Sequence, residues 1–335
     1  MNGSVPALLA IALAGVLAVS GSGASQATHV PTTAAPGTPD SRAGGALITE
    51  HRYRILGKLR LAFFWAGRDN VGSARMTRRS DGTTTALTFL VGSNPRRAPH
   101  SLNRWSYVRE EVGSDRAEVF TLRSLGSDET AAEPREVSTE NPLFGVSCAS
   151  FRGPDVRSAH TTVAAPGTTY WMFDRLLEQI AASPDWRERR IARPAGASAG
   201  FLTALQQLMR LGSTDAGALA SAPAAVYVFN NAIYDLNVRD SQVLGRTKVG
   251  ARWFDRLIRT DFAIRNRTTA EISRFGVTYT PDRTGSSLPI QIFYQPSFWL
   301  RVELRLDEAA EVPADPAADS SVLRRIRAIC AAAGD

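Results

Sequence analysis

One segment of the chain carries the residue pattern of a serine hydrolase nucleophile. Residues 196–200 are Gly-Ala-Ser-Ala-Gly, a literal G-x-S-x-G with Ser198 at its centre. In α/β-hydrolases this pattern links a buried strand to a helix, and the histidine base follows later in the chain. Here the basic residues 189–194 form a poor buried strand, and the last histidine, His160, precedes the motif. We therefore interpret the motif as a small-residue turn near a helix N-terminus, with a secreted hydrolase using Ser198 as the alternative.

Other side chains that could perform chemistry do not group into a recognisable site. The histidines are His29, His51, His100 and His160. None of them pairs with another at metal-ligand spacing, and the two cysteines do not complete a site. Glu110 and Glu111 are adjacent near the end of an expected strand, so their side chains should point to opposite faces rather than form a carboxylate dyad. The sequence thus predicts no catalytic residues, no metal and no cofactor.

The charge of the chain admits anionic partners. It has 335 residues and a net charge of +7, and all of its 39 basic residues except Lys58 and Lys248 are arginine. Arginine binds phosphate and carboxylate groups well, so lipid headgroups or acidic glycans are candidate partners. The arginines form no continuous run of the kind that marks a nucleic-acid surface, and we expect no nucleic-acid partner. We favour arginines scattered along solvent-exposed faces over an anionic site.

The N-terminus has the pattern of an export signal. Residues 5–19 are apolar and too few for a typical membrane span, and small residues suited to signal peptidase follow them. We expect a signal peptide over residues 1–27 and a Pro/Thr/Ala-rich tether over residues 28–46, although no Lys or Arg precedes the apolar run. An uncleaved anchor is the alternative. Cleavage would leave a periplasmic or secreted protein that is not integral to a membrane.

The C-terminus is expected to form a short docked helix. Residues 308–318 have the composition of a linker, and residues 319–333 combine N-cap residues with one apolar stripe. The two cysteines of the chain are Cys148 and Cys330. In an oxidising compartment they could form a disulfide that joins this helix to the body, and two buried free thiols are the equally weighted alternative.

Apolar and polar residues alternate with a period of two along most of the body, which is typical of strands. The longest alternating runs are residues 51–65 and residues 288–306. Further strands are expected at residues 71–78, 84–91, 104–112, 117–124, 156–163, 225–238, 257–267 and 271–280. The short gaps between them favour antiparallel pairing.

Two helices interrupt this pattern, at residues 170–182 and 201–211, within a helical insert at about 168–212. We therefore expect one mainly β domain over residues 47–307. Its fold should be a large curved antiparallel sheet or open half-barrel with a central helical pair and a C-terminal helix. Sheets of this size tend to curl, and we expect the helices to cover the concave face.

Large apolar and aromatic residues in the strands could line a cavity between sheet and helices. The candidates are Tyr53, Ile55, Leu59, Leu61, Phe63, Trp65, Trp105, Phe298 and Trp299. Such a cavity would take an apolar or amphipathic, lipid-like ligand. The alternative is an ordinary sheet core, the commoner use of aromatic residues.

Two stretches resemble a group of known proteins. Residues 53–72, and especially residues 288–300 (Leu-Pro-Ile-Gln-Ile-Phe-Tyr-Gln-Pro-Ser-Phe-Trp-Leu), are similar to bacterial exported proteins of unknown function with an L-P-x-x-I…P-x-x-W-L pattern. The expected architecture also resembles the unclosed β-barrel of periplasmic lipoprotein carriers, whose lipid-anchored members carry an N-terminal Cys that this chain lacks. The resemblance carries over no catalytic residue.

The two long amphipathic strands and their helical cover lead to our first hypothesis, a non-enzymatic envelope protein that binds an apolar or amphipathic ligand in a curved β-sheet cavity. A scaffold that binds an envelope protein through an exposed strand edge is a further alternative.

Overall fold

Sixteen strands and three α-helices account for most of the described chain. The computed structural model describes residues 45–61, 64–94, 96–98, 104–124, 143–165, 172–183, 185–214, 225–281, 287–297 and 300–333. The expected signal peptide and nearly all of the expected tether lie outside these residues, as do His29, His100, Phe63, Phe298 and Trp299. No helix in this described part combines the length and apolar composition needed to cross a bilayer.

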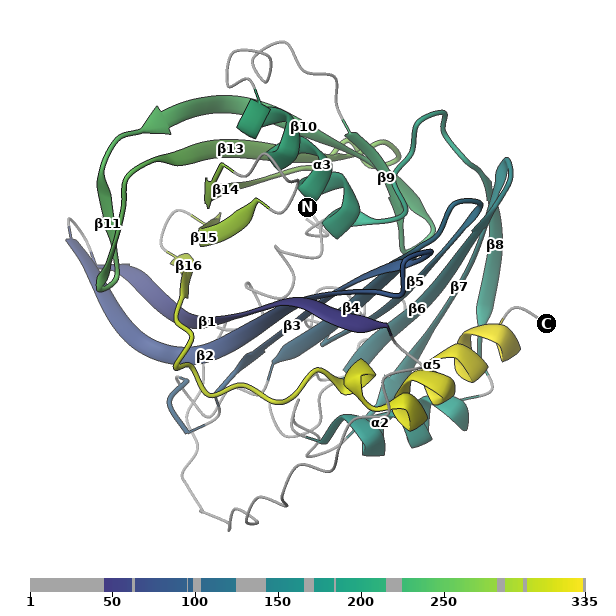
Figure 1. Cartoon of the computed structure of the whole chain (residues 1–335). Coiled ribbons are helices and arrows are strands. Elements are labelled where there is room, and N and C mark those ends of the chain that lie inside the picture. Colours follow the sequence, from purple (N-terminus) through teal and green to yellow (C-terminus); the bar gives the residue numbers. More distant parts are fainter. Residues whose placement is uncertain are drawn as a thin grey trace.

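Fourteen strands form one antiparallel sheet that does not close into a barrel (Figure 1). They are β1 (Ala46–Leu61), β2 (Phe64–Ser80), β3 (Thr85–Ser93), β4 (Trp105–Val112), β5 (Arg116–Ser124), β6 (Leu143–Arg152), β7 (Asp155–Ala164), β8 (Arg187–Ala192), β9 (Ala225–Phe229), β10 (Ala232–Leu244), β13 (Leu257–Asn266), β14 (Ile272–Thr280), β15 (Leu288–Ser297) and β16 (Leu300–Leu306). Their order is β8-β7-β6-β5-β4-β3-β2-β1-β16-β15-β14-β13-β10-β9. The expected mainly β fold, a large curved antiparallel sheet, is confirmed.

Each of the two longest expected strands is a hairpin. The prediction of a single strand over residues 51–65 is wrong, because β1 ends at Leu61, which pairs with Phe64 of β2. Likewise, residues 288–306 form β15 and β16, with Ser297 paired to Leu300. The residues between the strands, Ala-Phe and Phe-Trp, include none of the Gly, Asn or Asp that usually mark such turns. Alternation alone therefore does not reveal the reversals.

In the main sheet, the single strand expected over residues 225–238 is the hairpin of β9 and β10, and strands β6 and β8 were not expected from the sequence. Strand β6 is rich in small residues, with the sequence LFGVSCASFR. Strand β8, RERRIA, is charged and mostly exposed, as suits its place at an edge of the sheet. Neither β6 nor β8 alternates bulky apolar side chains with polar ones, which is the pattern typical of a half-buried strand.

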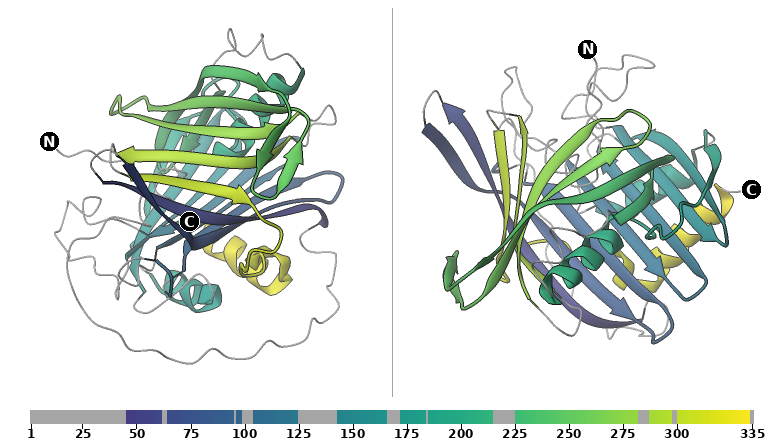
Figure 2. Two further views of the ribbon diagram at one scale, coloured as in Figure 1. Left: turned by 90° about the vertical axis from the view of Figure 1, so that its left-hand side faces the viewer. Right: turned by 90° about the horizontal axis from the view of Figure 1, so that it is seen from above.

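Of the helices in the described residues, α3 (Phe201–Thr214) lies on the concave side of the sheet (Figures 1 and 2). Phe201, Leu205 and Leu208 belong to one core cluster with Tyr53 of β1 and Phe275 of β14. The helix therefore joins two distant parts of the curved sheet.

The other two helices cover the opposite face, so the expectation that all helices lie on the concave side is wrong. Helices α2 (Phe173–Ala181) and α5 (Ser320–Ala332) lie together beneath β3–β7 in Figure 1. Their apolar residues cluster with Trp105 and Tyr107 of β4. The cause lies in the strands themselves, because every residue of β3 except Thr85 is buried and both of its faces therefore need cover.

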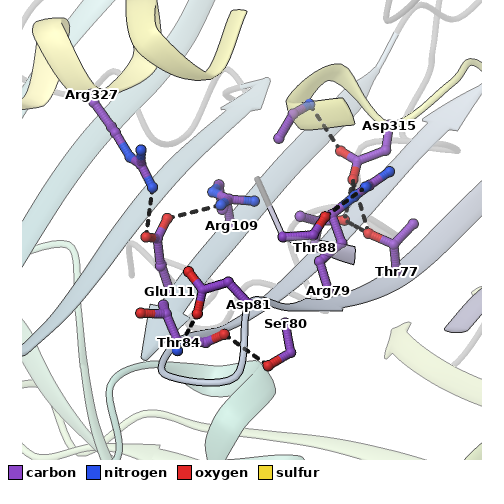
Figure 3. Close-up of polar contacts among 12 residues, drawn as sticks. Thr77, Arg79, Ser80, Asp81, Thr84, Thr88, Arg109, Glu111, Asp315 and Arg327 are labelled. Atoms are coloured by element: carbon purple, nitrogen blue, oxygen red, sulfur yellow. Dashed lines mark hydrogen bonds and ion pairs between the residues drawn. The ribbon is translucent and has the colours of Figure 1, made fainter. Parts of the chain in front are cut away.

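Covalent and polar contacts hold the C-terminal segment in place. Cys148 of β6 and Cys330 of α5 form a disulfide, which decides between the two thiol alternatives. The segment expected to be a linker is ordered and includes the short helix η4 (Pro316–Ala318). Buried Asp315 accepts a hydrogen bond from Thr77 Oγ1 at 2.9 Å and lies 3.6 Å from Arg79 Nε (Figure 3). This anchor fixes the path of the chain from the sheet to α5.

Helix α3 is held at its N-terminus by a buried carboxylate from the sheet. Glu110 accepts hydrogen bonds from the backbone N–H groups of Leu202 and Thr203 at 2.7 and 2.8 Å, and from Thr203 Oγ1 at 2.6 Å. Three donors and the helix dipole favour the charged carboxylate. Burial outweighs them and raises the pKa of Glu110 above its usual range.

The buried carboxylate makes the stability of the fold depend on pH. Because the folded pKa of Glu110 lies above its ordinary value of 4.5, the folded chain holds its proton more tightly than the unfolded chain. The free energy of unfolding that this group contributes is therefore complete below pH 4.5 and falls as the pH rises through the raised pKa. We expect Glu110→Gln to remove this pH dependence of the free energy of unfolding. It should also lower that free energy by about 1–3 kcal/mol, because donors at the start of α3 lose their charged partner. Urea unfolding at several pH values from below 4.5 upward measures the pH dependence and the loss of stability. Glu311→Gln, at an exposed position, is the control and should keep the pH dependence of the natural chain.

The disulfide should contribute a large share of the stability. The bridged cysteines are 182 residues apart, and for a loop of this size the chain-entropy model gives at most about 5 kcal/mol. We expect a reducing agent to lower the urea midpoint of the natural chain and to leave the Cys148→Ala, Cys330→Ala double variant unchanged. An unchanged midpoint in the natural chain would contradict a stabilising bridge.

Candidate functional site

A groove of about 770 Å³ runs along the convex face of the sheet, between α5 and strands β4–β8. One wall is apolar. It consists of Leu323 and Ile326 of α5, Phe120 of β5 and the disulfide between Cys148 and Cys330. The apolar stripe of α5 faces the sheet because Val322, Leu323, Ile326 and Ile329 are all buried.

The floor of the groove is set by the register of the strands. Arg116 of β5 lies directly opposite Arg152 of β6, and Arg157 of β7 lies directly opposite Arg190 of β8. Side chains that are directly opposite each other on neighbouring antiparallel strands share a face. All four of these arginines line the groove. The strands thus bring together two like-charged pairs, an arrangement that costs stability unless other charges offset it.

Carboxylates of the protein neutralise these arginine pairs only in part. Arg157 binds Glu188 through Nε at 2.5 Å and Nη2 at 3.3 Å. Within the described chain, Arg116, Arg152 and Arg190 make no ion pair. All three are exposed on the open side of the groove.

At the end of the groove nearest β4, two arginines share one carboxylate. Glu111 accepts hydrogen bonds from Arg109 Nη2 at 2.8 Å and from Arg327 Nη2 of α5 at 2.7 Å (Figure 3). Arg109 is buried, and its Nη1 atom has no hydrogen-bond partner in the described structure. Six arginines line the groove against three carboxylates, those of Glu111, Glu118 and Asp155, so its charge is positive.

The residues expected to line a cavity do not come together. Tyr53 and Ile55 lie in the core cluster around α3, whereas Trp105 lies on the other face against Phe144 and Phe173, with ring centroids 4.9 and 6.1 Å apart. The side chains of Leu59, Leu61 and Trp65 lie outside the described part, as do Phe63, Phe298 and Trp299 entirely. The described candidates are core residues, and none of them lines the groove.

The G-x-S-x-G segment has a structural explanation. Ser198 is buried, its backbone N–H donates to Val226 O at 2.8 Å, and its hydroxyl donates to Gln207 Oε1 at 3.2 Å. Gly196 has a positive φ of 71°. A Cβ at Gly200 would collide with the carboxylate of Glu110. Each glycine thus meets a backbone requirement of the turn that leads into α3.

No base accompanies Ser198 in the described residues. His160 Nδ1 instead lies 2.8 Å from Asn231 Nδ2, and burial lowers its pKa. Glu110 and Glu111 point to opposite faces, as the strand alternation predicts, and each binds a different helix. Among the described residues, no three His, Cys, Asp or Glu side chains gather as metal ligands would.

Sequence patterns could not reveal the groove. Its four floor arginines lie on four strands, two of which, β6 and β8, were not expected. The sequence interpretation of scattered arginines on solvent-exposed faces is right about exposure but does not reveal the pairing. Only the register places Arg116 beside Arg152.

Comparisons of the chain with protein-family models, curated proteins and solved structures found no match.

The arginine pairs should weaken the fold at low salt. We expect Arg116→Gln and Arg190→Gln each to raise the free energy of unfolding by about 0.2–1 kcal/mol, because each removes a like-charged cross-strand contact. The gain should shrink at an ionic strength of about 1 M, where the Debye length is about 3 Å. Urea unfolding at both salt concentrations tests this, with Arg274→Gln, exposed on β14 opposite Ala263, as the control. Destabilisation by both groove variants would show that the pairs are not repulsive.

Proposed function

We propose that the protein is a non-enzymatic, exported protein of the bacterial envelope that binds an anionic amphipathic molecule, such as a lipid, in the α5 groove. The observation that carries this proposal is the two pairs of arginines that lie directly opposite each other in the strand register, Arg116 with Arg152 and Arg157 with Arg190, beside apolar lining residues. An anion held between them would relieve the repulsion that the protein itself offsets only in part.

The chemistry of the groove suits a ligand with two unlike ends. Guanidinium groups bind phosphate or carboxylate oxygens in bidentate fashion, and such charge-assisted hydrogen bonds are strong. The side chains of Phe120, Leu323 and Ile326 line the groove but are almost fully buried, so an acyl or other hydrocarbon chain would contact only their outermost atoms. A volume of about 770 Å³ is within the usual range for sites that bind small molecules.

Export is supported by the disulfide and by the expected signal peptide. Disulfides persist in oxidising compartments such as the periplasm and are rare in the cytosol of mesophiles. The groove replaces the concave cavity suggested by the resemblance to lipoprotein carriers, because α3 occupies the concave side. The proposal thus keeps the ligand class and moves the site to the convex face.

A scaffold role is the second candidate, and strand β8 is the observation that favours it. Within the described residues, strand β8 pairs only with β7, which leaves its other edge open to strand addition in this part of the chain. However, four of its six residues are charged, and charged edges protect sheets against pairing. The edge therefore supports this role less well than the groove supports ligand binding.

Calorimetry with dodecyl phosphate below its micelle concentration tests the groove. We expect binding to the purified full chain, and a loss of affinity of about tenfold or more in the Arg116→Gln, Arg190→Gln double variant, because charge-assisted hydrogen bonds are lost. Arg274→Gln should bind normally, and neutral dodecyl maltoside should bind much more weakly. Equal binding of the two detergents, unaffected by the double variant, would reject the proposal.

A further inference from the structure

A separate feature of the fold, remote from the groove in sequence, is a hairpin that continues beyond the main sheet. Strands β11 (Thr247–Val249) and β12 (Arg252–Phe254) extend the β10–β13 ladder past its last pair, Leu244 with Leu257. They form a two-stranded sheet of their own, which appears in Figures 1 and 2 as a projecting arm. Gly250, with a φ of 61°, allows the tight turn at the tip.

This arm carries an exposed tryptophan. Trp253 is 58% exposed, more than any other large apolar side chain in the described structure. It lies directly opposite Lys248 on the hairpin. Leaving the large apolar surface of a tryptophan in water is unfavourable. Its amphipathic ring favours the boundary between hydrocarbon and headgroups in a bilayer.

Positive charges surround the ring. The guanidinium carbon of Arg246 lies 5.1 Å from the Trp253 ring centroid, and Lys248 Nζ lies 6.0 Å from it. On the other face of the hairpin, Arg252 lies 6.0 Å from the ring centroid of Phe254. Residues 245–256 hold four basic side chains and one acidic one, Asp255. The tip is therefore both aromatic and cationic.

These contacts also cover part of the ring locally. Yet the ring remains more than half exposed with both cations in place, and those cations are themselves exposed. An exposed aromatic ring edged by cations is complementary to a surface whose outer layer is anionic and whose next layer is apolar. An anionic lipid bilayer has that order of layers.

We propose that hairpin 245–256 docks the protein peripherally on an anionic lipid surface, with Trp253 entering the headgroup layer and Arg246 and Lys248 contacting lipid phosphates. The proposal stands on its own geometry and does not depend on the groove. It concerns a bilayer surface, whereas the groove would hold a single molecule.

Co-sedimentation with vesicles tests the hairpin. The probes are vesicles of phosphatidylcholine alone and vesicles of phosphatidylcholine with phosphatidylglycerol, each mixed with the full chain at low and high salt. The full chain is used for every variant, so that its apolar N-terminal segment contributes equally. Binding to neutral vesicles then measures all contributions that do not depend on lipid charge.

We expect the natural chain to bind the anionic vesicles more tightly, and salt to weaken that preference. Neutralising Arg246 and Lys248 as Arg246→Gln and Lys248→Gln should lower the anionic binding by about fivefold for each charge. Trp253→Ala should also lower it, and the fluorescence difference between the natural chain and Trp253→Phe should shift to shorter wavelength on anionic vesicles.

Ile272→Ala is the matched control, because Ile272 is 55% exposed and lies outside the hairpin, at the start of β14. It should bind like the natural chain. Circular dichroism of each variant confirms that the fold is kept. Vesicle binding that is equal in the hairpin variants and the natural chain would overturn the proposal. Binding through the hairpin to heparin but not to anionic vesicles would also overturn it, and would indicate a soluble polyanion instead.

Discussion

The constraint on which the rest of this structure depends is that the central strands are apolar on both faces. In β4, Val108 packs into the core around α3, whereas Trp105 and Tyr107 pack against α2 and α5. A sheet of this kind is stable only when both faces are covered, so helices must lie on each side of it. The disulfide and the anchor at Asp315 follow from that need, because they hold the C-terminal helix against the convex face. The groove begins where the cover provided by α5 ends and the strands become charged.

Two adjacent residues of β4 show how one strand organises both sides. The Glu110 carboxylate accepts the backbone N–H groups at the start of α3, and the Glu111 carboxylate binds Arg327 of α5. The two carboxylates reach opposite faces of the sheet because successive side chains of a strand point in opposite directions. The contact to α3 also explains the glycine of the hydrolase-like motif at Gly200, which leaves room for the Glu110 carboxylate. A sequence pattern associated with catalysis is thus used here for packing.

Two places on the described surface gather basic side chains next to apolar ones. The groove sets facing arginines beside an apolar wall, and the hairpin sets cations around an exposed tryptophan. Both sites combine cationic and apolar surface, the combination that an anionic amphiphile requires. A protein that takes up such molecules and works at a membrane surface would use both, one for the single molecule and the other for the bilayer from which it comes.

The sequence by itself located many of the helices and strands. Alternation located most strands, apolar stripes located the three helices, and adjacency placed Glu110 and Glu111 on opposite faces. Hairpin reversals without turn residues, such as that between Leu61 and Phe64, were not visible because alternation does not record chain direction. Only the tertiary structure decided which face each helix covers, that Cys148 meets Cys330, and that Arg116 lies beside Arg152. These facts depend on strand register and on contacts between distant segments, whereas periodicity reports only which neighbouring residues share a face.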